Sequence, residues 1–238
     1  MRIEERGLKG EGKPGLSIII PALNEAQGIV RTLEALQPLR ARGHEVIVVD
    51  GGSADGTTAA AAPLADRCVA APRGRARQMN AGAALAAGEA LLFLHADTRL
   101  PADADRAVLA ALAARSWGRF DVRIDGRSPL LGLVALCMNW RSRLSGIATG
   151  DQAIFVRREA FTAAGGFPDI PLMEDIALSA RLKRLSRPAC LAAKAVTSGR
   201  RWERRGVLRT VLLMWRLRLG YFRGAAPDEL ARRYANGA

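Results

Sequence analysis

Carboxylates follow three apolar runs in the first hundred residues. Glu25 comes shortly after the run that ends at Pro21, Asp50 ends the second run, and Asp97 follows the run that ends at His95. The carboxyl ends of parallel strands meet at one edge of a sheet, so these acids are expected to lie together. Converging carboxylates repel one another unless a cation or hydrogen-bonding ligand is bound. The pattern predicts a ligand site; the alternative is that strands end in polar residues by default.

The second of these acids opens a turn that contains glycine. Asp50 is followed by Gly51 and Gly52, and then by Ser53 and Asp55, either of which can cap the next helix. Glycine lets a backbone approach a ligand closely, and Asp50 is placed to accept hydrogen bonds from a base or a ribose. The turn matches neither GxGxxG nor GxxxxGK[ST], which argues against a nicotinamide dehydrogenase and a P-loop enzyme.

The elements that must position these residues alternate between apolar runs and alanine-rich helical stretches as far as residue 97. This alternation is typical of a parallel sheet covered by helices. Strands are predicted at 16–21, 45–50, 67–71 and 90–95, with helices at 25–39, 53–65 and 75–87. Later elements are less regular: helices to 115, at 130–144 and from 174, strands at 119–125, 153–156 and 190–196, and two C-terminal helices. One α/β domain with an irregular second half is predicted.

Histidine, cysteine and aromatic content exclude several classes of function. His44 and His95 are the only histidines in the sequence, so carboxylates must do most of the chemistry. Cys68, Cys137 and Cys190 are widely spaced without a CxxC pair, which argues against a disulfide framework or a zinc site and favours a reducing compartment. Aromatic residues make up only 5% and no nucleic-acid motif is present, so nucleic acid is not a predicted partner.

Four motifs between residues 16 and 185 make the prediction more specific. They are IIIPALNE at 18–25, VVDGGSADGT at 48–57, RQMNAG at 77–82 and LFLHAD at 92–97, with the acidic pair Glu174-Asp175 after them. In order and spacing they resemble family 2 glycosyltransferases. The implied structure is a single-domain A-type glycosyltransferase fold, with a Rossmann-like mixed central sheet flanked by helices and with C-terminal helices. RGRARQMN, HAD, GDQ at 150–152 and RRW at 200–202 are most similar to the bacterial arsenosugar-biosynthesis or selenodomain-associated subgroup.

The resemblance implies an inverting glycosyltransferase of the hexosyltransferase type, which moves a sugar from a nucleoside diphosphate sugar to an unidentified acceptor. Asp175 carries over as the general base; a helix cap is the alternative for this residue and Glu174. The implied donor-binding residues are Pro21, Asn24, Glu25, Asp50, Gly52, Ser53, Arg77, Asp97 and Arg201. The implied acceptor-binding residues are Asp151, Gln152, Glu174 and Trp202.

Two basic segments are expected near the donor diphosphate. In the first, Arg77 is preferred as the donor contact, while a solvated helix face explains Arg73 and Arg75 equally well. The second, residues 200–202, is expected to be a mobile loop that closes over the diphosphate.

The metal site departs from the family's pattern, because His95 stands where the D-x-D motif has its first acid. Asp97 is the implied metal ligand, and His95 is either a weak second ligand or a buried imidazole. Mn²⁺ or Mg²⁺ is the expected cofactor, since diphosphate oxygens and water can complete its coordination. The altered motif leaves open a non-catalytic, membrane-associated nucleotide-sugar-binding protein. A sugar-1-phosphate nucleotidyltransferase is disfavoured, because its glycine-rich, arginine-containing loop is absent after the first strand.

The positive charge is concentrated at the C-terminal end. The net charge is +13, and residues 181–238 hold 15 Lys and Arg against 3 Asp and Glu. Arg209, Arg216 and Arg223 recur every seven residues beside apolar side chains. This pattern predicts either a helix lying on an anionic membrane surface or one packed on its own domain with a solvated arginine face.

These patterns predict the organisation of the whole chain. A flexible leader is expected at 1–15, the glycosyltransferase domain at 16–200 and basic helices at 201–238. The domain divides into a nucleotide-binding half at 16–100 and an acceptor half at 101–200. No targeting segment and no apolar run long enough to span a bilayer is found. A cytoplasmic protein is therefore expected, with peripheral binding to the inner face of the membrane as the alternative.

Overall fold

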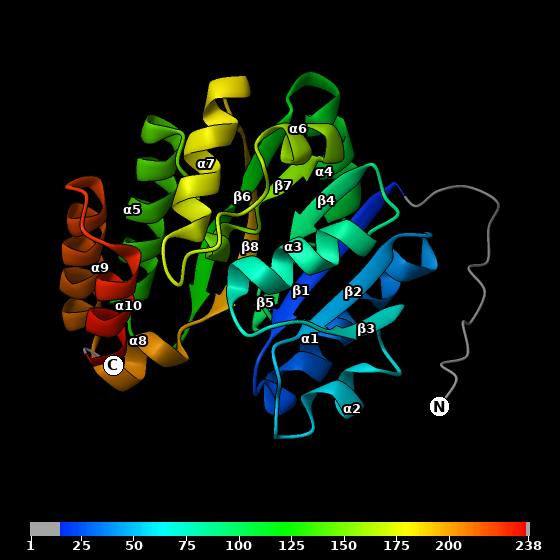
Figure 1. Ribbon diagram of the computed structural model, residues 1–238, viewed down its shortest axis with the longest axis horizontal. Coiled ribbons are helices and arrows are strands. Elements are labelled where there is room, and N and C mark those ends of the chain that lie inside the picture. Colours follow the sequence, from blue (N-terminus) through cyan, green and yellow to red (C-terminus); the bar gives the residue numbers. More distant parts are fainter. Residues whose placement is uncertain (1–14, 237–238) are drawn as a thin grey trace.

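The computed structural model describes residues 15–236, so all but the last residue of the predicted leader lies outside the described residues. Its centre is one eight-stranded sheet with the strand order β3-β2-β1-β4-β7-β6-β8-β5 (Figure 1). The strands are β1 (Leu16–Ala22), β2 (Glu45–Asp50), β3 (Arg67–Ala70), β4 (Ala90–Phe93), β5 (Thr98–Arg99), β6 (Trp117–Asp125), β7 (Phe155–Arg157) and β8 (Ala189–Ser198).

The sheet is parallel in its first half and mixed in its second. β1 pairs in parallel with β2 and β4, and β2 with β3. β7 runs antiparallel to both of its neighbours, β4 and β6, while β8 is parallel to β6 and antiparallel to β5. β1, β2 and β4 are buried along their whole length, because helices cover both faces of this part of the sheet.

Helices pack on both faces of the sheet. They are α1 (Ala26–Ala41), α2 (Thr57–Ala61), α3 (Arg75–Leu85), α4 (Ala104–Ala114), α5 (Leu130–Ser145), the 3₁₀ helix η1 (Gly150–Gln152), α6 (Arg158–Ala163), α7 (Glu174–Leu185), α8 (Arg200–Arg205), α9 (Val207–Phe222) and α10 (Pro227–Asn236). The core on one face joins α1, α2 and α4 to the strands. The core on the other face joins α3, α6 and α7 to them. The predicted single α/β domain with a mixed central sheet is confirmed.

α3 lies especially close to the parallel strands, which matters because its first residues reach the site. A Cβ added at Gly82 would meet Ile19 at 2.5 Å and Val49 at 3.0 Å, so only glycine lets the helix approach this far. The Gln78 side chain donates to the carbonyls of Ala22 and Val49, both at 2.8 Å. These contacts set the distance of α3 from the sheet.

The C-terminal helices close one end of the molecule (Figure 1). Leu217 of α9 and Leu230 of α10 are buried in a cluster with Met173 and Ile176 at the start of α7. Within the part of the chain that the structure describes, no helix is long and apolar enough to cross a membrane.

Several predicted boundaries were wrong. The helix expected at 53–65 is only Thr57–Ala61, because the residues before it form a loop held by side-chain hydrogen bonds. Residues 200–202, expected as a loop, are the first turn of α8, and the C-terminal segment holds three helices instead of two. The short elements β5, η1 and α6 were not predicted, because two to six residues carry too little periodicity to be recognised.

Candidate active site

A cleft of about 360 Å³ opens at the carboxyl ends of β1 and β4. The last residues of β1 and the segments after β1 and β4 contribute Pro21, Glu25, His95 and Asp97 to its lining. The cleft also reaches the start of α3 on one side and the C-terminal helices on the other. Of the acids predicted to converge at this edge of the sheet, Glu25 and Asp97 therefore line the cleft, whereas Asp50 does not.

The loops after β1 and β2 are tied together by hydrogen bonds. The backbone N–H of Asn24 donates to Ser53 Oγ at 2.9 Å, and the Asn24 side-chain oxygen accepts from the N–H of Ala54 at 3.0 Å. The N–H of Glu25 donates to Thr57 Oγ1 at 2.8 Å. Asn24 and Ser53 were expected to bind the donor directly. In the structure their side-chain oxygens accept hydrogen bonds that join the two loops. Their effect on the cleft is to hold Glu25 at its edge.

Asp50 is buried next to this pair of loops and does not line the cleft. Its Oδ2 accepts the N–H groups of Gly52 and Ser53 at 3.0 and 2.9 Å, which shapes the glycine turn. Gly52 has a φ of +90°, a backbone conformation that glycine adopts without strain. The other oxygen, Oδ1, is buried without a hydrogen-bond partner among the described residues. An acceptor left in this state is costly, so a ligand N–H or O–H would stabilise it.

Two acids that line the cleft, Glu25 and Asp97, lie close enough for their charges to interact. Burial and then the nearby Asp97 raise the pKa of Glu25, while Arg200, with Nη2 at 3.7 Å from Glu25 Oε2, acts in the opposite direction. No hydrogen bond or ion pair joins the Asp97 carboxylate to another described residue. Among the described residues that line the cleft, Asp97 is therefore the acid whose carboxylate has neither a hydrogen bond nor an ion pair.

His95 connects the cleft to η1. Its Nδ1 lies 3.2 Å from Oδ1 of Asp151, which also lines the cleft. Burial would raise the pKa of Asp151, but the hydrogen bond and the charge of His95 outweigh it and lower this pKa. The imidazole lies against Gly150, where an added Cβ would collide with the ring.

The predicted acidic pair begins α7 in a small cavity behind His95. Asp175 Oδ2 accepts the N–H of Gly150 at 2.8 Å, and its Oδ1 accepts the N–H of Ile176 at 2.7 Å. Burial, and then the charge of Asp175, raises the pKa of Glu174 to about 7. Burial also raises the pKa of Asp175, against these backbone hydrogen bonds. His95 lines both this cavity and the cleft, so it stands between the two.

Backbone strain is concentrated at the same place. Three described residues other than glycine have a positive φ: Asn24 at +54°, Ala153 at +47° and Met173 at +70°. Each adjoins a predicted site motif, before Glu25, after GDQ, and before the acidic pair at 174–175. Such conformations cost about 1–3 kcal/mol each and cluster at functional sites. The strain supports the assignment of function to this region.

Arg75 at the start of α3 reaches the cleft, as does Arg73 just before the helix. Arg77, the residue preferred from the sequence, lies outside and pairs with Asp169 (Nε to Oδ1, 2.8 Å). Two residues apart on a helix means about 200° around its axis, so the two side chains point to opposite sides. Burial would lower the pKa of Arg75, but nearby acids, first Glu174, outweigh it and raise this pKa. The assignment of Arg77 is corrected to Arg75.

Gln152 is a second correction. Its side chain is fully buried and serves the 3₁₀ turn: Oε1 accepts the N–H of Thr149 at 3.2 Å, and Nε2 donates to Asn139 Oδ1 at 3.4 Å. It cannot contact an acceptor from this position. Its neighbour Asp151 does line the cleft.

The C-terminal helices supply one wall of the cleft. Arg201 and Trp202 of α8 line it. Tyr234 of α10, which sequence reasoning missed, lines it too; its hydroxyl bonds to Arg201, and the guanidinium groups of Arg201 and Arg205 lie 5.4 and 5.5 Å from its ring centroid. No local motif marks Tyr234, since only the packing of α10 on α9 brings it here.

The donor set fits a metal held mainly by its substrate. Among residues 15–236, no three His, Cys, Asp or Glu side chains are grouped to hold a metal ion. Asp97 alone offers an unpaired carboxylate to the cleft, with the His95 imidazole nearby. Mg²⁺ and Mn²⁺ accept one or two protein carboxylates when phosphate oxygens and water complete the coordination. The residues present are therefore sufficient for such an ion only in the presence of a diphosphate.

Residues 17–130 match the family model described as "Glycosyl transferase family 2". No curated protein matches the chain in sequence. The matched segment contains the parallel strands β1, β2, β3 and β4, and the cleft residues Glu25, Arg75, His95 and Asp97. The family resemblance expected from the motifs is thus confirmed for this half of the chain.

Solved structures share the fold. The mannosyltransferase PcManGT from Pyrobaculum calidifontis, in complex with GDP-Man and Mn²⁺, superposes with a TM-score of 0.63 at 21% identity over 95% of this chain and 70% of that chain. S. aureus TarS 1-349 in complex with UDP-GlcNAc gives 0.61 at 17% identity, over 77% and 58%. Glucosyl-3-phosphoglycerate synthase from Mycobacterium tuberculosis, with Mn²⁺, UDP and glucosyl-3-phosphoglycerate, gives 0.59 at 21%, over 78% and 71%.

These similarities concern the fold. The chain spans less than two thirds of the TarS fragment and somewhat more of the other two proteins. At about one identical residue in five, the likeness identifies an A-type glycosyltransferase fold and leaves activity and substrates to be argued from the site.

Proposed function

We propose that this chain is an inverting glycosyltransferase that moves a hexosyl group from a nucleoside diphosphate sugar to an acceptor hydroxyl. The observation that carries the proposal is the cleft, in which an unpaired carboxylate and a helix N-terminus bearing an arginine meet. A buried acidic pair with raised pKa values lies in the small cavity behind His95. The family match over residues 17–130 and the nucleotide-sugar complexes of the similar structures support it.

The donor's diphosphate would lie at the start of α3. The helix has no acidic residue in its first turn, and Gly74 and Arg75 line the cleft there. Free N–H groups and the helix dipole favour anions at this end, and guanidinium groups bind phosphate oxygens in pairs. Arg201 faces the same space from α8. The nucleoside would lie toward Pro21 and toward the unpartnered Oδ1 of Asp50.

Asp97 would hold a divalent ion, with His95 as a weak second ligand. Such an ion, when bound, neutralises charge that develops on the leaving diphosphate. We assign His95 a second task, because its Nδ1 lies 3.2 Å from Asp151 Oδ1 and its hydrogen bond and charge lower the pKa of that acid against the effect of burial. The site therefore keeps Asp151 ionised in the cleft, where it can accept a hydrogen bond from an acceptor hydroxyl, next to Trp202.

Asp175 is the proposed general base. Its raised pKa makes it a better proton acceptor than Asp151, whose pKa is lowered. Position favours the other acid, because Asp151 lines the cleft while Asp175 lies in the small cavity behind His95. Each oxygen of Asp175 accepts one backbone N–H and keeps a free lone pair for a substrate proton. We choose Asp175 over Asp151 because of its higher basicity, and substitution of each acid tests this choice.

The two arginines of α3 make a matched pair for testing the donor site. Arg75→Ala is expected to raise KM and Kd for the donor roughly 10- to 100-fold, because a charge-assisted hydrogen bond contributes about 1.5–3 kcal/mol. Arg77→Ala should change both less than about twofold, since its exposed ion pair with Asp169 lies outside the cleft. Calorimetric titration with UDP and GDP measures both. Equal effects of the two substitutions would contradict the placement of the diphosphate at Arg75.

The function itself is tested without knowledge of the acceptor. UDP- and GDP-sugars, with and without Mn²⁺, are screened by thermal shift, and any stabilising donor is then incubated with the protein to measure slow hydrolysis. We expect one nucleotide to stabilise the protein in a Mn²⁺-dependent way and its sugar to be released with inversion at the anomeric carbon, read by NMR. Binding without hydrolysis would instead indicate a non-catalytic nucleotide-sugar-binding protein. The similarity of four motifs to the arsenosugar-biosynthesis subgroup suggests an arsenosugar-type acceptor, which we propose to test once a donor has been found.

A further inference from the structure

The outer surface of α9 is apolar although it is exposed. Its side chains Leu208, Leu212, Trp215, Leu219 and Phe222 are between 50% and 72% accessible. At about 100° per residue they fall within an arc of about 80°, which is one continuous stripe. The opposite side of the helix is buried through Val207, Thr210 and Leu217. Packing on the domain, the alternative weighed from the sequence, thus accounts for only one side of α9.

α5 has the same character. Its inner side is buried through Leu131, Ala135, Asn139 and Ser142. On its outer side the exposed large side chains are again apolar: Leu130, Leu133, Leu136, Trp140 and Leu144, between 40% and 80% accessible. A row of large apolar side chains on the exposed side of a helix indicates a surface that binds a partner or lipid.

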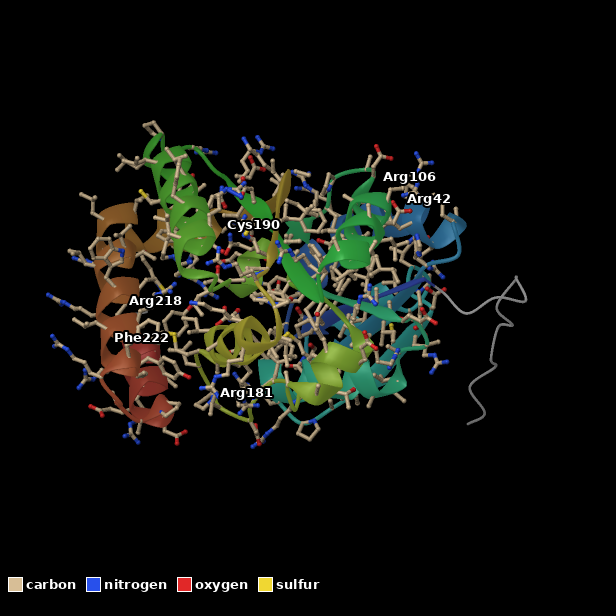
Figure 2. All side chains as sticks on the ribbon, turned by 90° about the horizontal axis from the view of Figure 1, so that it is seen from above. Arg42, Arg106, Arg181, Cys190, Arg218 and Phe222 are labelled. Carbon is tan, nitrogen blue, oxygen red and sulfur yellow. The ribbon has the colours of Figure 1, made fainter. Side chains whose placement is uncertain are left out.

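The two stripes form one surface, which we call the α5–α9 face. Val134 and Met138 of α5 share a cluster with Val207 and Val211 of α9, so the helices pack side by side. Figures 1 and 2 show them adjacent at one end of the molecule, and Phe222 is labelled at that end in Figure 2. Ten of the thirteen large exposed apolar side chains of the described residues lie on these two helices. Scattered exposure does not explain this concentration.

The charged side chains that α5 and α9 themselves carry are all positive, although Arg143 of α5 is paired with Asp121 of β6. Neither helix contains an Asp or Glu, whereas α5 carries Arg141 and Arg143 and α9 carries Arg209, Arg216 and Arg218. Arg209 and Arg216, followed by Arg223, fall at the edge of the apolar stripe of α9. An apolar centre bordered by arginines complements the acyl region and the anionic headgroups of a bilayer.

We propose that the α5–α9 face binds the surface of an anionic lipid bilayer, with both helices lying in the plane of the interface. Trp140 and Trp215 would take the interfacial positions that tryptophan favours. Contact between two copies of this face fits less well, because it would bring arginine against arginine without an acid on either helix to pair with them. The proposal does not depend on the glycosyltransferase activity.

Bilayer binding would bring the cleft close to the membrane. Thr210 and Met214, on the inner side of α9, line the cleft, and Trp202 of α8 adjoins both the cleft and the cluster beneath the α5–α9 face. Only the thickness of one helix, about 10 Å, separates the cleft from the proposed lipid contact. An acceptor presented at the membrane surface would be within reach.

Vesicle flotation tests the proposal with the full chain. Phosphatidylcholine vesicles with and without phosphatidylglycerol are used, and ionic strength is raised from about 0.01 M to about 1 M. We expect binding to anionic vesicles at low salt that falls steeply with salt. Leu212→Ser/Trp215→Ser should weaken it at least tenfold, because two apolar side chains no longer enter the interface. Leu85→Ser/Leu185→Ser, at exposed leucines outside the face, is the matched control and should bind like the wild type.

The charge contribution has its own matched pair. Arg209→Gln/Arg216→Gln should weaken binding to anionic vesicles roughly 25-fold, at about fivefold per arginine. Arg106→Gln/Arg115→Gln removes two exposed charges, one on α4 and one directly after it, both outside the α5–α9 face, and should change binding little. Figure 2 labels Arg106 at the end of the molecule away from α9. Donor hydrolysis without lipid is measured for every variant and should not change. If the two double variants lost the same amount of vesicle binding, the net charge of the protein and not the α5–α9 face would explain the binding, and the proposal would be overturned.

Two other results would also overturn it. The first is absence of binding at low salt by folded protein, as judged by an unchanged thermal transition. The second is a concentration-dependent dimer in sedimentation velocity that Leu212→Ser/Trp215→Ser dissociates, without vesicle binding by either form. That result would assign the α5–α9 face to a second copy of the chain.

Discussion

Asp175→Asn is expected to lower kcat for donor hydrolysis by roughly 10²–10⁴-fold while leaving donor affinity nearly unchanged. A general base acts on the proton of the attacking hydroxyl only in the transition state, and water takes the place of the acceptor in hydrolysis. The asparagine side chain can still accept the N–H of Gly150, so the start of α7 should lose at most about 1 kcal/mol. Kinetics over a range of donor concentrations separate kcat from KM, and a thermal melt checks folding.

Asp151→Asn is the companion variant, because the two acids lie on either side of His95. If Asp175 is the base, Asp151→Asn should reduce kcat much less and should mainly weaken acceptor binding once an acceptor is found. A near wild-type rate for Asp175→Asn together with a large loss for Asp151→Asn would transfer the role to Asp151. If neither substitution lowered kcat much, neither acid would be the base, and Glu174 and Asp175 would only cap α7.

Asp97→Ala is expected to abolish the Mn²⁺-dependent part of donor binding, with a loss of roughly 100-fold or more in donor affinity in the presence of the metal. The reason is that Asp97 is the unpaired carboxylate of the cleft and no second carboxylate stands beside it in the altered D-x-D motif. His95→Ala should weaken metal-dependent binding about tenfold, within the range for groups that support a metal site. Titrations with UDP or GDP, in Mn²⁺ and in EDTA, measure both effects.

Asp169→Asn is the matched control for this experiment. Asp169 is an exposed acid that pairs with Arg77 outside the cleft, so its loss should not alter affinity in Mn²⁺ or in EDTA. Unchanged metal-dependent affinity in Asp97→Ala would sink the assignment of the metal ligand. Equal affinity of the wild type in Mn²⁺ and in EDTA would show that the diphosphate is bound by Arg75 and Arg201 without a metal.

The parallel half of the fold could be predicted from the sequence because its signals are local. Continuous apolar runs mark strands covered on both faces, and the alternation with helices places their carboxyl ends at one edge. For this reason the sequence predicts that Glu25, Asp50, His95 and Asp97 lie together. Glu25, His95 and Asp97 line one cleft, whereas Asp50 is buried beside the glycine turn and does not line it. The glycine turn after Asp50 is equally local, since Asp50 and the N–H groups it binds are two and three residues apart.

Which side of a helix faces the site could be determined only from the tertiary structure. Arg75 and Arg77 are equally plausible as sequence, and only the packing of α3 on β1 and β2, made close by Gly82, turns Arg75 toward the cleft and Arg77 toward Asp169. Gln152 is similar, because a polar residue in a motif looks accessible until the fold buries its side chain, here within η1 itself.

The sequence alone determined where the chain carries its acids, its glycine turn and its apolar stripes, because period and composition are properties of short segments. Tertiary structure decided which of these surfaces meet. The C-terminal helices fold back to place Trp202 and Tyr234 in a cleft built mainly from the first hundred residues. The same packing buries one side of α5 and α9 and leaves the other exposed. Contacts between segments so far apart depend on the complementary shapes of whole elements, which no local pattern encodes.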